Sequence, residues 1–439
     1  MKAVIMAGGR GTRIASIARD IPKPMIPLAG KPVIAHQIER LMENGFTDIT
    51  VVVGHLGQQI KDYFGCGYSF DGNGRCAISY YTETEPLGTA GALYKLPDVT
   101  EDFLVINGDI VFDIDFSRML AFHKRRNAIA TLAAHPNSHP EDSALLITDG
   151  EDRVTAWLSK EDPRGHFRNL VNAGIHLLKK EALPAQRDEK VDLDRNILKP
   201  LIASGGVFAY KTPEYIKDMG TPERYAAVSR DMEQGIVGSR NLSKPQKAVF
   251  LDRDGTINRA AGFVRRPEEL VLLDGAAEAV RLINRAGYLA IVITNQPVIA
   301  RGEVTLAELA EIHRKMETDL GREGAFVDDI FFCPHHPDRG YAGERAEYKI
   351  DCACRKPAPG LILQAAAQYT IDPGRSFMVG DSPRDVLAGI AAGCTPVLLS
   401  ASEPSGPLAD ALQGRRVDCF PSLRDFALRR LPPAGGGGT

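Results

Sequence analysis

The sequence Phe250-Leu251-Asp252-Arg253-Asp254-Gly255-Thr256 places two carboxylates one residue apart at the end of the apolar run Lys247–Leu251. The run predicts a buried strand, and the polar residues after it predict a loop at the carboxyl end of that strand. Ligands of open α/β sheets bind at this end of the strands. Because the stretch lies well past the middle of the chain, it indicates a site separate from anything near the N-terminus.

Apolar, β-rich segments alternate with amphipathic helical segments, and the pattern restarts after residue 247. In the first half, we expect strands at 2–7, 49–53 and 103–106 and a helix at 32–44. In the second half, we expect strands at 248–251, 289–293 and 376–379 and a helix at 275–285. This alternation is typical of mostly parallel sheets covered by helices on both faces. The sequence therefore predicts an α/β protein with two doubly wound sheets; one large shared sheet is the alternative.

The expected domains are 1–236 and 247–430, with a linker at 237–246 and a flexible tail at 431–439. The linker segment is polar, lacks periodicity and contains Pro245, as linkers do. The tail is rich in Pro and Gly, so it has no side chains with which to form a core.

The composition excludes several classes of function. Hydrophobic residues make up 44% and charged residues 25% of the 439 positions, as in ordinary globular proteins. The net charge of −3 argues against a nucleic-acid partner, and no apolar run approaches the roughly 18–20 residues of a membrane span. The N-terminal strand is too short and Gly-rich for a signal peptide, and seven cysteines, an odd number, suggest reduced thiols in a cytoplasmic protein. Oligomerisation is left open.

A glycine-rich loop, Gly8-Gly9-Arg10-Gly11-Thr12-Arg13, directly follows the first predicted strand. Glycines let the backbone approach a phosphate closely and expose N–H donors to it. Arg10, Arg13 and Lys23 add positive charge. The loop is neither the dinucleotide fingerprint nor a Walker loop, and a plain turn with surface arginines is the alternative.

Further motifs in the first half supply small residues and carboxylates at strand ends. They are Glu85-Pro-Leu-Gly-Thr-Ala-Gly91, Asn107-Gly-Asp109, Asn172-Ala-Gly-Ile175 and Asp218-Met-Gly-Thr-Pro222. Asp109 and Asp218 are candidates to hold one Mg²⁺ against a triphosphate, because Mg²⁺ favours oxygen ligands and substrate phosphates. Either residue could instead be a turn aspartate.

Together these motifs resemble the sugar-1-phosphate nucleotidyltransferase family over about residues 1–235. The resemblance implies a Rossmann-like domain in which a sugar 1-phosphate attacks the α-phosphorus of a nucleoside triphosphate and pyrophosphate leaves. It implies that the loop glycines Gly8, Gly9 and Gly11, with Arg13 and Lys23, hold phosphates. By the same resemblance, Gly88 and Thr89 lie near the base, and Asn172 and Asp194 contact the sugar. The chain departs from the family at Ser159-Lys160, often Glu-Lys, and at Asp194, often Glu.

The second half continues the Asp252-x-Asp254 motif with Thr294-Asn295, Lys356 and Gly380-Asp381-Ser-Pro-Arg-Asp385 in order. This set resembles the haloacid-dehalogenase-type phosphatases with a minimal cap; a solvated turn is the alternative for one Asp-x-Asp alone. The resemblance implies that Asp252 attacks phosphorus and that Asp254 is the general acid and base. It implies that Thr294 and Lys356 bind the phosphoryl oxygens. It also implies a Mg²⁺ site at Asp252, Asp381 and Asp254, the last through a nearby backbone carbonyl.

Cys333-Pro-His335 and Cys352-Ala-Cys354 offer three sulfurs and one imidazole, which suit a tetrahedral structural Zn²⁺. His336 is a rival ligand, and three unrelated cysteines are the alternative. A closed four-ligand site leaves no position for water, so the expected role is structural. The site would hold the loop 333–354 and present Arg355 and Lys356 to substrate.

These features of the second half resemble, over about 247–425, the D-glycero-D-manno-heptose 1,7-bisphosphate phosphatases, and histidinol-phosphate phosphatases share much of the pattern. By resemblance, Asn295 and Arg355 contact substrate. The chain departs from the family at Val298, where a small residue is usual. That phosphatase leaves heptose 1-phosphate, which fits the first half as a substrate. We therefore expect a bifunctional enzyme that forms GDP-D-glycero-α-D-manno-heptose from GTP. The alternatives are another sugar or nucleotide, such as mannose 1-phosphate with UTP or CTP, a histidinol-phosphate-type phosphatase half, or a regulatory protein with a dead domain.

Overall fold

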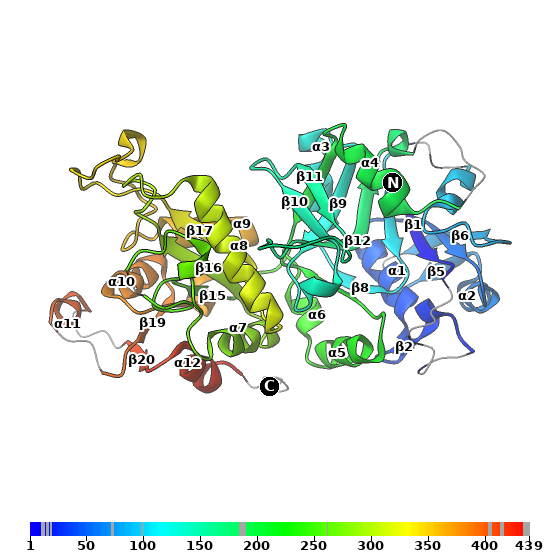
Figure 1. Ribbon diagram of the computed structural model, residues 1–439. Helices are drawn as coiled ribbons and strands as arrows, with labels where there is room; N and C mark the ends of the chain where they lie inside the picture. The colour runs from blue at the N-terminus through cyan, green and yellow to red at the C-terminus, as the bar shows by residue number, and fades with distance from the viewer. Residues whose placement is uncertain are drawn as a thin grey trace. The chain divides into compact units, whose positions relative to one another are not determined.

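The computed structural model describes residues 1–9, 14, 17, 20–71, 74–97, 99, 101–183, 190–260, 262–402, 406–412 and 417–432. The chain divides into two compact units (Figure 1). The first unit comprises Met1–His135, Leu146–Ser159 and Leu170–Asn241, and the second comprises Pro136–Leu145, Lys160–Asn169 and Leu242–Thr439. Gly11 and Arg13 of the predicted phosphate loop lie outside the described residues.

The first unit is built on a mixed sheet in which ten strands are described, with β1 (Lys2–Ala7) near its centre. β1 pairs in parallel with β4 (Asp48–Val53) and β7 (Phe103–Asn107), and β4 pairs in parallel with β6 (Arg75–Thr82). The other strands of this sheet are β5 (Gly67–Ser69), β9 (Ala130–His135), β10 (Leu145–Thr148), β11 (Val154–Leu158), β12 (Val171–Leu178) and β13 (Val207–Lys211). β12 runs antiparallel to β7, so the parallel core has an antiparallel flank that the sequence pattern did not predict.

Helices and short ribbons complete the first unit. The helices are α1 (Val33–Glu43), α2 (Gln58–Phe64), α3 (Phe116–Arg126), α4 (Lys199–Ile202), α5 (Pro222–Glu233) and α6 (Ile236–Ser239). The ribbons are β2 (Pro27–Leu28) with β3 (Lys31–Pro32), and β8 (Ile110–Asp113) with β14 (Tyr215–Asp218). α1 buries Ile34, Ile38 and Leu41 at helical spacing against the core of the sheet.

The second unit contains a parallel sheet of six described strands in the order β17-β16-β15-β18-β19-β20. They are β15 (Ala248–Leu251), β16 (Leu289–Asn295), β17 (Asp329–Cys333), β18 (Phe377–Gly380), β19 (Thr395–Leu399) and β20 (Asp418–Phe420). The helices are α7 (Ala276–Arg285), α8 (Leu306–Arg322), α9 (Gly360–Tyr369), α10 (Pro383–Ala392), α11 (Pro407–Leu412) and α12 (Leu423–Arg430). All four residues of β15 are buried, as expected for a strand covered on both faces. The predicted α/β class with mostly parallel sheets is confirmed.

The segment 237–246, expected as a polar linker, is largely packed. Its first three residues belong to helix α6, and Val237, Leu242 and Gln246 are buried. Within the first unit, Asn241 Nδ2 donates to Asp113 Oδ1 at 2.6 Å. Within the second unit, the Gln246 N–H donates to the Thr370 carbonyl at 2.8 Å. The division between the units therefore falls inside this segment, after Asn241.

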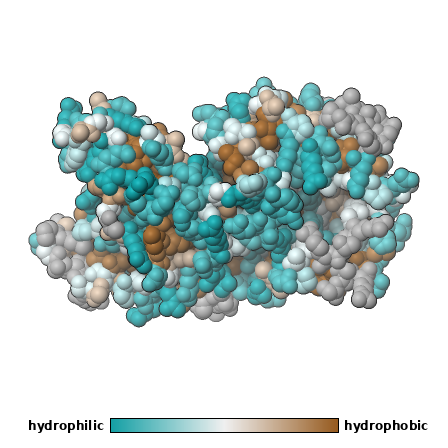
Figure 2. Space-filling view, in the orientation of Figure 1, coloured by the Kyte–Doolittle hydropathy of each residue, from teal (hydrophilic) through white to brown (hydrophobic). Residues whose placement is uncertain are grey.

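None of the described helices is both long enough and apolar enough to cross a membrane. The visible face is mainly hydrophilic, with smaller apolar patches between the polar residues (Figure 2).

Candidate active sites

The carboxyl ends of adjacent strands bring the predicted phosphatase residues together in the second unit. Asp252 follows β15, Asn295 ends β16 and Asp381 follows β18. Leu251 is in register with Val292 and Val379 on its two neighbours, so these three ends lie at the same edge of the sheet. The site therefore sits where the fold class places ligands.

Lys356 is the buried cation at the centre of this site. Its Nζ lies 2.8 Å from Asp252 Oδ1 and 2.5 Å from Asp385 Oδ1, and it also donates to the Ile293 carbonyl at 2.8 Å. Burial lowers the pKa of Lys356, but Asp252 and Asp385 more than offset this effect, and the net direction is upward. The ammonium is therefore charged and lies next to the predicted nucleophile.

The Asn295 side chain binds the backbone of Lys356. Its Nδ2 donates to the Lys356 carbonyl at 3.0 Å, and its Oδ1 accepts from the Lys356 N–H at 3.0 Å. Both polar atoms of the side chain thus hold the backbone that carries Lys356. Thr294, also predicted at this site, is buried, and its hydroxyl accepts from Gln296 Nε2 at 2.9 Å.

Asp385 was not predicted as a site residue, although its side chain is fully buried against Lys356. It also caps α10, because Ser382 N and Oγ donate to its Oδ2 at 3.0 and 2.7 Å. In sequence, Ser382 to Asp385 has the spacing of an ordinary helix cap, which conceals the second role. The only available signal was an acidic residue close behind the Gly380-Asp381 pair.

Asp254 has a carboxylate that is fixed by three neighbouring side chains. Arg253, which is completely buried, donates through Nη2 to both oxygens at 2.9 and 2.8 Å. Asn258 Nδ2 donates to Oδ1 at 2.9 Å, and Gln296 Nε2 donates to Oδ2 at 3.0 Å. None of Arg253, Asn258 and Gln296 was predicted. They hold the Asp254 side chain in one orientation, as a general acid requires.

The carboxylates that meet closely enough to hold a metal ion, among the described residues, are Asp252, Asp381 and Asp385. Asp385 joins the two carboxylates that were expected here, Asp252 and Asp381, whereas Asp254 was expected to contribute through a nearby backbone carbonyl. Burial raises the pKa of Asp252, an effect that Lys356 opposes, and burial raises the pKa of Asp381. Three carboxylates beside one ammonium leave excess negative charge. Oxygen donors with that charge suit Mg²⁺.

Cys333, His335, Cys352 and Cys354 form a compact group at the end of β17. The three Sγ atoms lie 3.2–3.5 Å apart, and His335 Nδ1 lies 3.3 Å from Cys354 Sγ. The donor set and its spacing fit one tetrahedral Zn²⁺. The rival His336 instead accepts from the Asp338 N–H at 3.3 Å through its Nδ1.

Arg355, predicted to contact substrate, follows this group directly. Its Nη1 donates to the His335 carbonyl at 3.1 Å. The side chain is thereby tied to the Cys/His loop, next to the backbone of Lys356.

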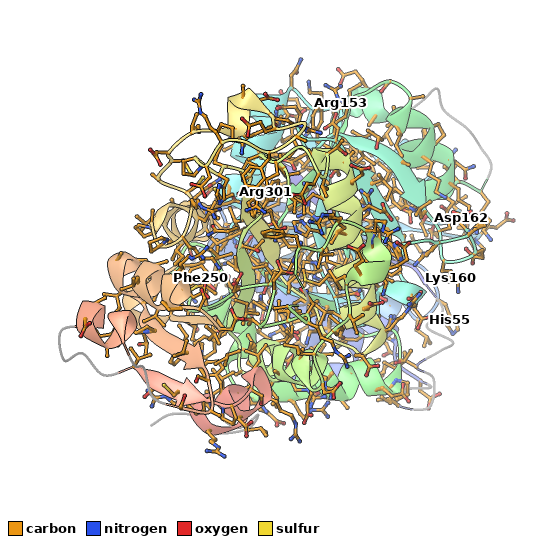
Figure 3. The ribbon with its side chains drawn as sticks, turned by 60° about the vertical axis from the view of Figure 1, so that its left-hand side comes forward. His55, Arg153, Lys160, Asp162, Phe250 and Arg301 are labelled. Atoms are coloured by element: carbon orange, nitrogen blue, oxygen red, sulfur yellow. The ribbon has the colours of Figure 1, made fainter. Side chains whose placement is uncertain are left out.

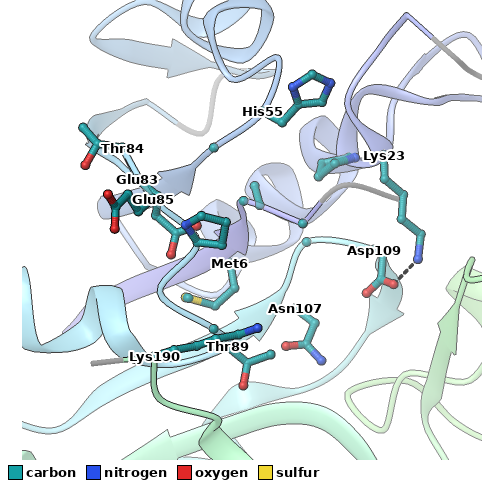
Figure 4. A pocket seen from close by; sticks show the side chains of 18 of the residues that line it. Met6, Lys23, His55, Glu83, Thr84, Glu85, Thr89, Asn107, Asp109 and Lys190 are labelled. Atoms are coloured by element: carbon teal, nitrogen blue, oxygen red, sulfur yellow. Dashed lines mark hydrogen bonds and ion pairs between the residues drawn. The ribbon is translucent and has the colours of Figure 1, made fainter. Parts of the chain in front are cut away.

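The first unit contains a cleft of about 920 Å³ at the carboxyl ends of its parallel strands (Figure 4). Of the predicted residues, it is lined by Gly8, Gly9, Lys23, Gly88, Thr89 and Asp109. Lys23 and Asp109 form an ion pair. His55, Glu83 and Lys190 also line the cleft and were not predicted. His55 and Glu83 lie just beyond the ends of β4 and β6. This position after a strand was the one feature of the sequence that could have identified them as residues of the cleft.

Two glycines of the cleft lie close to other residues, and at Gly88 the neighbour is backbone, which cannot move aside as a side chain can. A Cβ on Gly8 would lie 2.3 Å from Glu83 Oε2. A Cβ on Gly88 would lie 2.3 Å from the Val191 carbonyl oxygen, and Gly88 has a φ of +85°. Thr89, next to Gly88, accepts at its hydroxyl from the Leu193 N–H at 2.7 Å. These contacts fix the predicted base-binding turn against the segment that begins at Lys190.

The predicted metal and sugar residues of the first unit have partners within the protein. Arg224 Nη1 donates to both carboxylate oxygens of Asp218 at 2.9 Å. The Met219 N–H donates to the Asp109 carbonyl at 2.9 Å, which brings the two predicted metal ligands into one neighbourhood.

The two residues predicted to contact the sugar are Asn172, which lies on β12, and Asp194, which lies four residues after Lys190 of the cleft. Asn172 Oδ1 is 3.0 Å from His176 Nε2. Burial raises the pKa of Asp194 to about 6, with Asp192 adding to the rise. Neither Asn172 nor Asp194 is among the described residues that line the cleft.

Comparison with known proteins gives matches to both halves. The nucleotidyl transferase family model matches residues 2–235, and the HAD-hydrolase-like model matches residues 353–425. A D-glycero-β-D-manno-heptose-1,7-bisphosphate 7-phosphatase of Escherichia coli K12 is 38% identical over 194 residues, 44% of this chain and 100% of that protein. A mannose-1-phosphate guanylyltransferase of Mycobacterium tuberculosis is 31% identical over 246 residues, 55% of this chain and 67% of that protein.

Among solved structures, HddC of Yersinia pseudotuberculosis complexed with GMP-PN is 25% identical, with a TM-score of 0.45, over 53% of this chain and 99% of that chain. The sequence comparisons by themselves confirm both family resemblances inferred from the motifs. The chain belongs to the nucleotidyl transferase family through residues 2–235 and to the HAD-like phosphatases through its second half, and it combines a transferase with a hydrolase.

Proposed function

We propose that the chain carries out two consecutive steps of GDP-heptose synthesis. The second unit removes the 7-phosphate of D-glycero-α-D-manno-heptose 1,7-bisphosphate, and the first unit transfers GMP from GTP to the resulting heptose 1-phosphate. One observation carries the proposal. The relative that matches the second half over its whole length is named as a heptose 1,7-bisphosphate 7-phosphatase, so its product is a sugar 1-phosphate. Sugar 1-phosphates are the substrates of enzymes that resemble the first half.

The phosphatase step uses the contacts of Asp252, Asp254 and Lys356. A carboxylate oxygen of Asp252 forms a bond to phosphorus as the bond to the 7-oxygen breaks, and Asp254 gives a proton to the leaving oxygen. Asp254 then takes a proton from water. The water oxygen bonds to phosphorus, and the bond from phosphorus to Asp252 breaks. The Lys356 ammonium, 2.8 Å from Asp252, balances charge at the phosphoryl group.

The transfer step uses the cleft of the first unit. An oxygen of the sugar 1-phosphate forms a bond to the α-phosphorus of GTP, and the bond to pyrophosphate breaks. No covalent bond to the protein is needed, so positioning and charge neutralisation provide the catalysis. Gly8, Gly9, Gly88 and Lys23 line the cleft where the nucleotide would lie.

Metal ions are part of the proposal. Asp252, Asp381 and Asp385, with the backbone carbonyl at Asp254, would hold Mg²⁺, which supplies positive charge between a carboxylate and a phosphate. Asp109 and Asp218 would serve in the same way beside the triphosphate. Cys333, His335, Cys352 and Cys354 would hold a structural Zn²⁺. The thiolate ligands of that site suit the reducing cytoplasm, where we place the enzyme.

The proposal is tested most sharply by varying the anomer of the sugar bisphosphate and the base of the nucleoside triphosphate. The phosphatase relatives are named for the β-anomer of heptose 1,7-bisphosphate. The proposed guanylyl transfer, in contrast, uses the α-anomer of heptose 1-phosphate. Each anomer of the bisphosphate is supplied with GTP, ATP, UTP or CTP, and phosphate and pyrophosphate are measured. We expect both products with the α-anomer and GTP. Phosphate release without pyrophosphate from any triphosphate would overturn the coupling of the two steps.

A second candidate for the transfer step is mannose 1-phosphate, because a relative of the first half is a mannose-1-phosphate guanylyltransferase. The same pyrophosphate assay is run with GTP and mannose 1-phosphate. A kcat/KM for mannose 1-phosphate above that for heptose 1-phosphate would favour this candidate.

A further inference from the structure

Arg301 lies between two aromatic rings that come from two different loops of the second unit. The centre of its guanidinium is 4.5 Å from the centroid of Phe263 and 4.3 Å from the centroid of Tyr341. The centre of the Arg265 guanidinium also lies 5.8 Å from the centroid of Phe263, and Lys349 Nζ lies 4.5 Å from the centroid of Tyr341. These five side chains are called the cation stack below, and Arg301 is labelled in Figure 3.

Two of the three cations in the cation stack have a carboxylate partner, and the third, Arg301, has none among the described residues. Arg265 Nε lies 2.6 Å from Glu303 Oε2, and Lys349 Nζ lies 3.2 Å from Glu344 Oε2. Arg301, between the two rings, makes no ion pair with any described residue, and its Nε is buried without a hydrogen-bond acceptor. A buried donor without an acceptor costs free energy. The positive charge of Arg301 also has no anionic partner among the described residues, and an anion from outside the chain would supply one.

The cation stack is connected to the phosphatase site through the segment that follows β16. Gln296, whose amide holds Asp254, begins this segment, and Arg301 is five residues further on. The Arg345 N–H donates to the Ala300 carbonyl at 3.0 Å, which joins the segment to the loop between the Cys/His ligands.

Two further cations lie on the segments that carry catalytic residues. Arg355 directly precedes Lys356 in the chain, and Arg384 is in the first turn of α10, which follows Asp381.

We propose that Arg301 binds the phosphate group of the bisphosphate that is not hydrolysed. A sugar bisphosphate carries its second anion away from the phosphorus that Asp252 attacks, so an enzyme that selects it needs a cation at a distance from the nucleophile. A guanidinium suits this role because its planar fork makes two parallel hydrogen bonds to phosphate. Phe263 and Tyr341, with centroids 4.5 and 4.3 Å from the centre of the guanidinium, restrain its position. The inference rests on the proposed phosphatase function and names the residue that would select a bisphosphate over a monophosphate.

The test compares substrates with and without the second phosphate. Wild type, Arg301→Met and Arg301→Lys are assayed with heptose 1,7-bisphosphate, heptose 7-phosphate and p-nitrophenyl phosphate. For Arg301→Met we expect kcat/KM to fall at least tenfold, mainly through KM, with the bisphosphate, and less than twofold with the other two substrates. The kcat/KM of Arg301→Lys with the bisphosphate should lie between the values for wild type and Arg301→Met. The matched control is Arg265→Met, which removes a neutralised cation of the same stack and should change all three values less than twofold.

Two outcomes would overturn the inference. One is an equal loss on all three substrates, which would make Arg301 structural, and the other is no loss on the bisphosphate. Failure of the proposed function gives a different result, in which wild type hydrolyses p-nitrophenyl phosphate but not heptose 1,7-bisphosphate. The comparison is then made with fructose 1,6-bisphosphate and fructose 6-phosphate. Equal effects of Arg301→Met on these two substrates would still overturn the role of Arg301.

Discussion

The carboxylate of Asp385 lies 2.5 Å from the ammonium of Lys356, and both side chains are almost completely buried. Lys356 also contacts Asp252, so the position of the cation beside the nucleophile depends on Asp385. We predict that Asp385→Ala lowers phosphate release at least 100-fold and leaves pyrophosphate release intact. Removing one partner of a buried ion pair costs about 3–5 kcal/mol, so the melting temperature of the second unit should fall as well.

The control for this variant is Asp425→Ala. Asp425 accepts from the Ser422 hydroxyl at the start of α12, as Asp385 accepts from Ser382 at the start of α10, but it is more exposed and its ion partner is the surface residue Arg429, at 3.7 Å. It should cost about 1 kcal/mol, the usual value of a helix cap, with phosphate release unchanged. Equal activities for the two variants would remove Asp385 from the site.

Gly88→Ala should inactivate the transferase alone. The added Cβ would lie 2.3 Å from a backbone carbonyl oxygen, and the φ of +85° is unfavourable for alanine. We expect pyrophosphate release to fall more than tenfold while phosphate release is retained. Gly30→Ala is the control, because Gly30 has a φ of +87° but no atom within 4 Å of the new Cβ. A similar loss in both variants would mean that backbone strain, and not the contact with Val191, is responsible.

The strands and the carboxylates at their ends were predictable from the sequence, because a parallel sheet buried on both faces needs near-continuous apolar runs. β15 and Asp252 show this directly. Asp385 and Arg253 were missed because a capping spacing and a charge between two aspartates look like surface features. The antiparallel pairing of β12 with β7 depends on contacts between distant residues, which local pattern does not reveal.

Zinc content should depend on His335 and not on its neighbour. His335 Nδ1 lies 3.3 Å from Cys354 Sγ, whereas His336 contacts Asp338. We predict that His335→Ala and Cys352→Ser lose bound zinc, measured by elemental analysis, with a large loss of phosphatase stability. His336→Ala should keep one zinc per chain. Full zinc content in the Cys352→Ser variant would refute the site.

The stability of the first unit should fall in acid through His176. Burial lowers the pKa of this histidine to about 4, below the 6.5 of an exposed histidine. Between these values the unfolded chain binds a proton that the folded chain does not. Stability is therefore fully present above pH 6.5 and falls as the pH drops toward 4, by about 1.4 kcal/mol per unit for one proton.

The measurement is the melting temperature at pH 7.0 and pH 5.0. His176→Gln should lose less stability over this interval than wild type, by about 2 kcal/mol. His55→Gln is the control, because His55 is exposed, and it should behave as wild type. Equal losses in wild type and His176→Gln would contradict the assignment.

The most direct measurement of the bifunctional account uses one reaction mixture in which D-glycero-α-D-manno-heptose 1,7-bisphosphate is the sole sugar, with GTP and Mg²⁺. Wild type should release phosphate and pyrophosphate and form GDP-heptose. Asp252→Asn should form none of these products from the bisphosphate, yet it should release pyrophosphate at the wild-type rate when heptose 1-phosphate is added. Failure of wild type to form GDP-heptose, or loss of the transferase in the Asp252→Asn variant, would contradict the account.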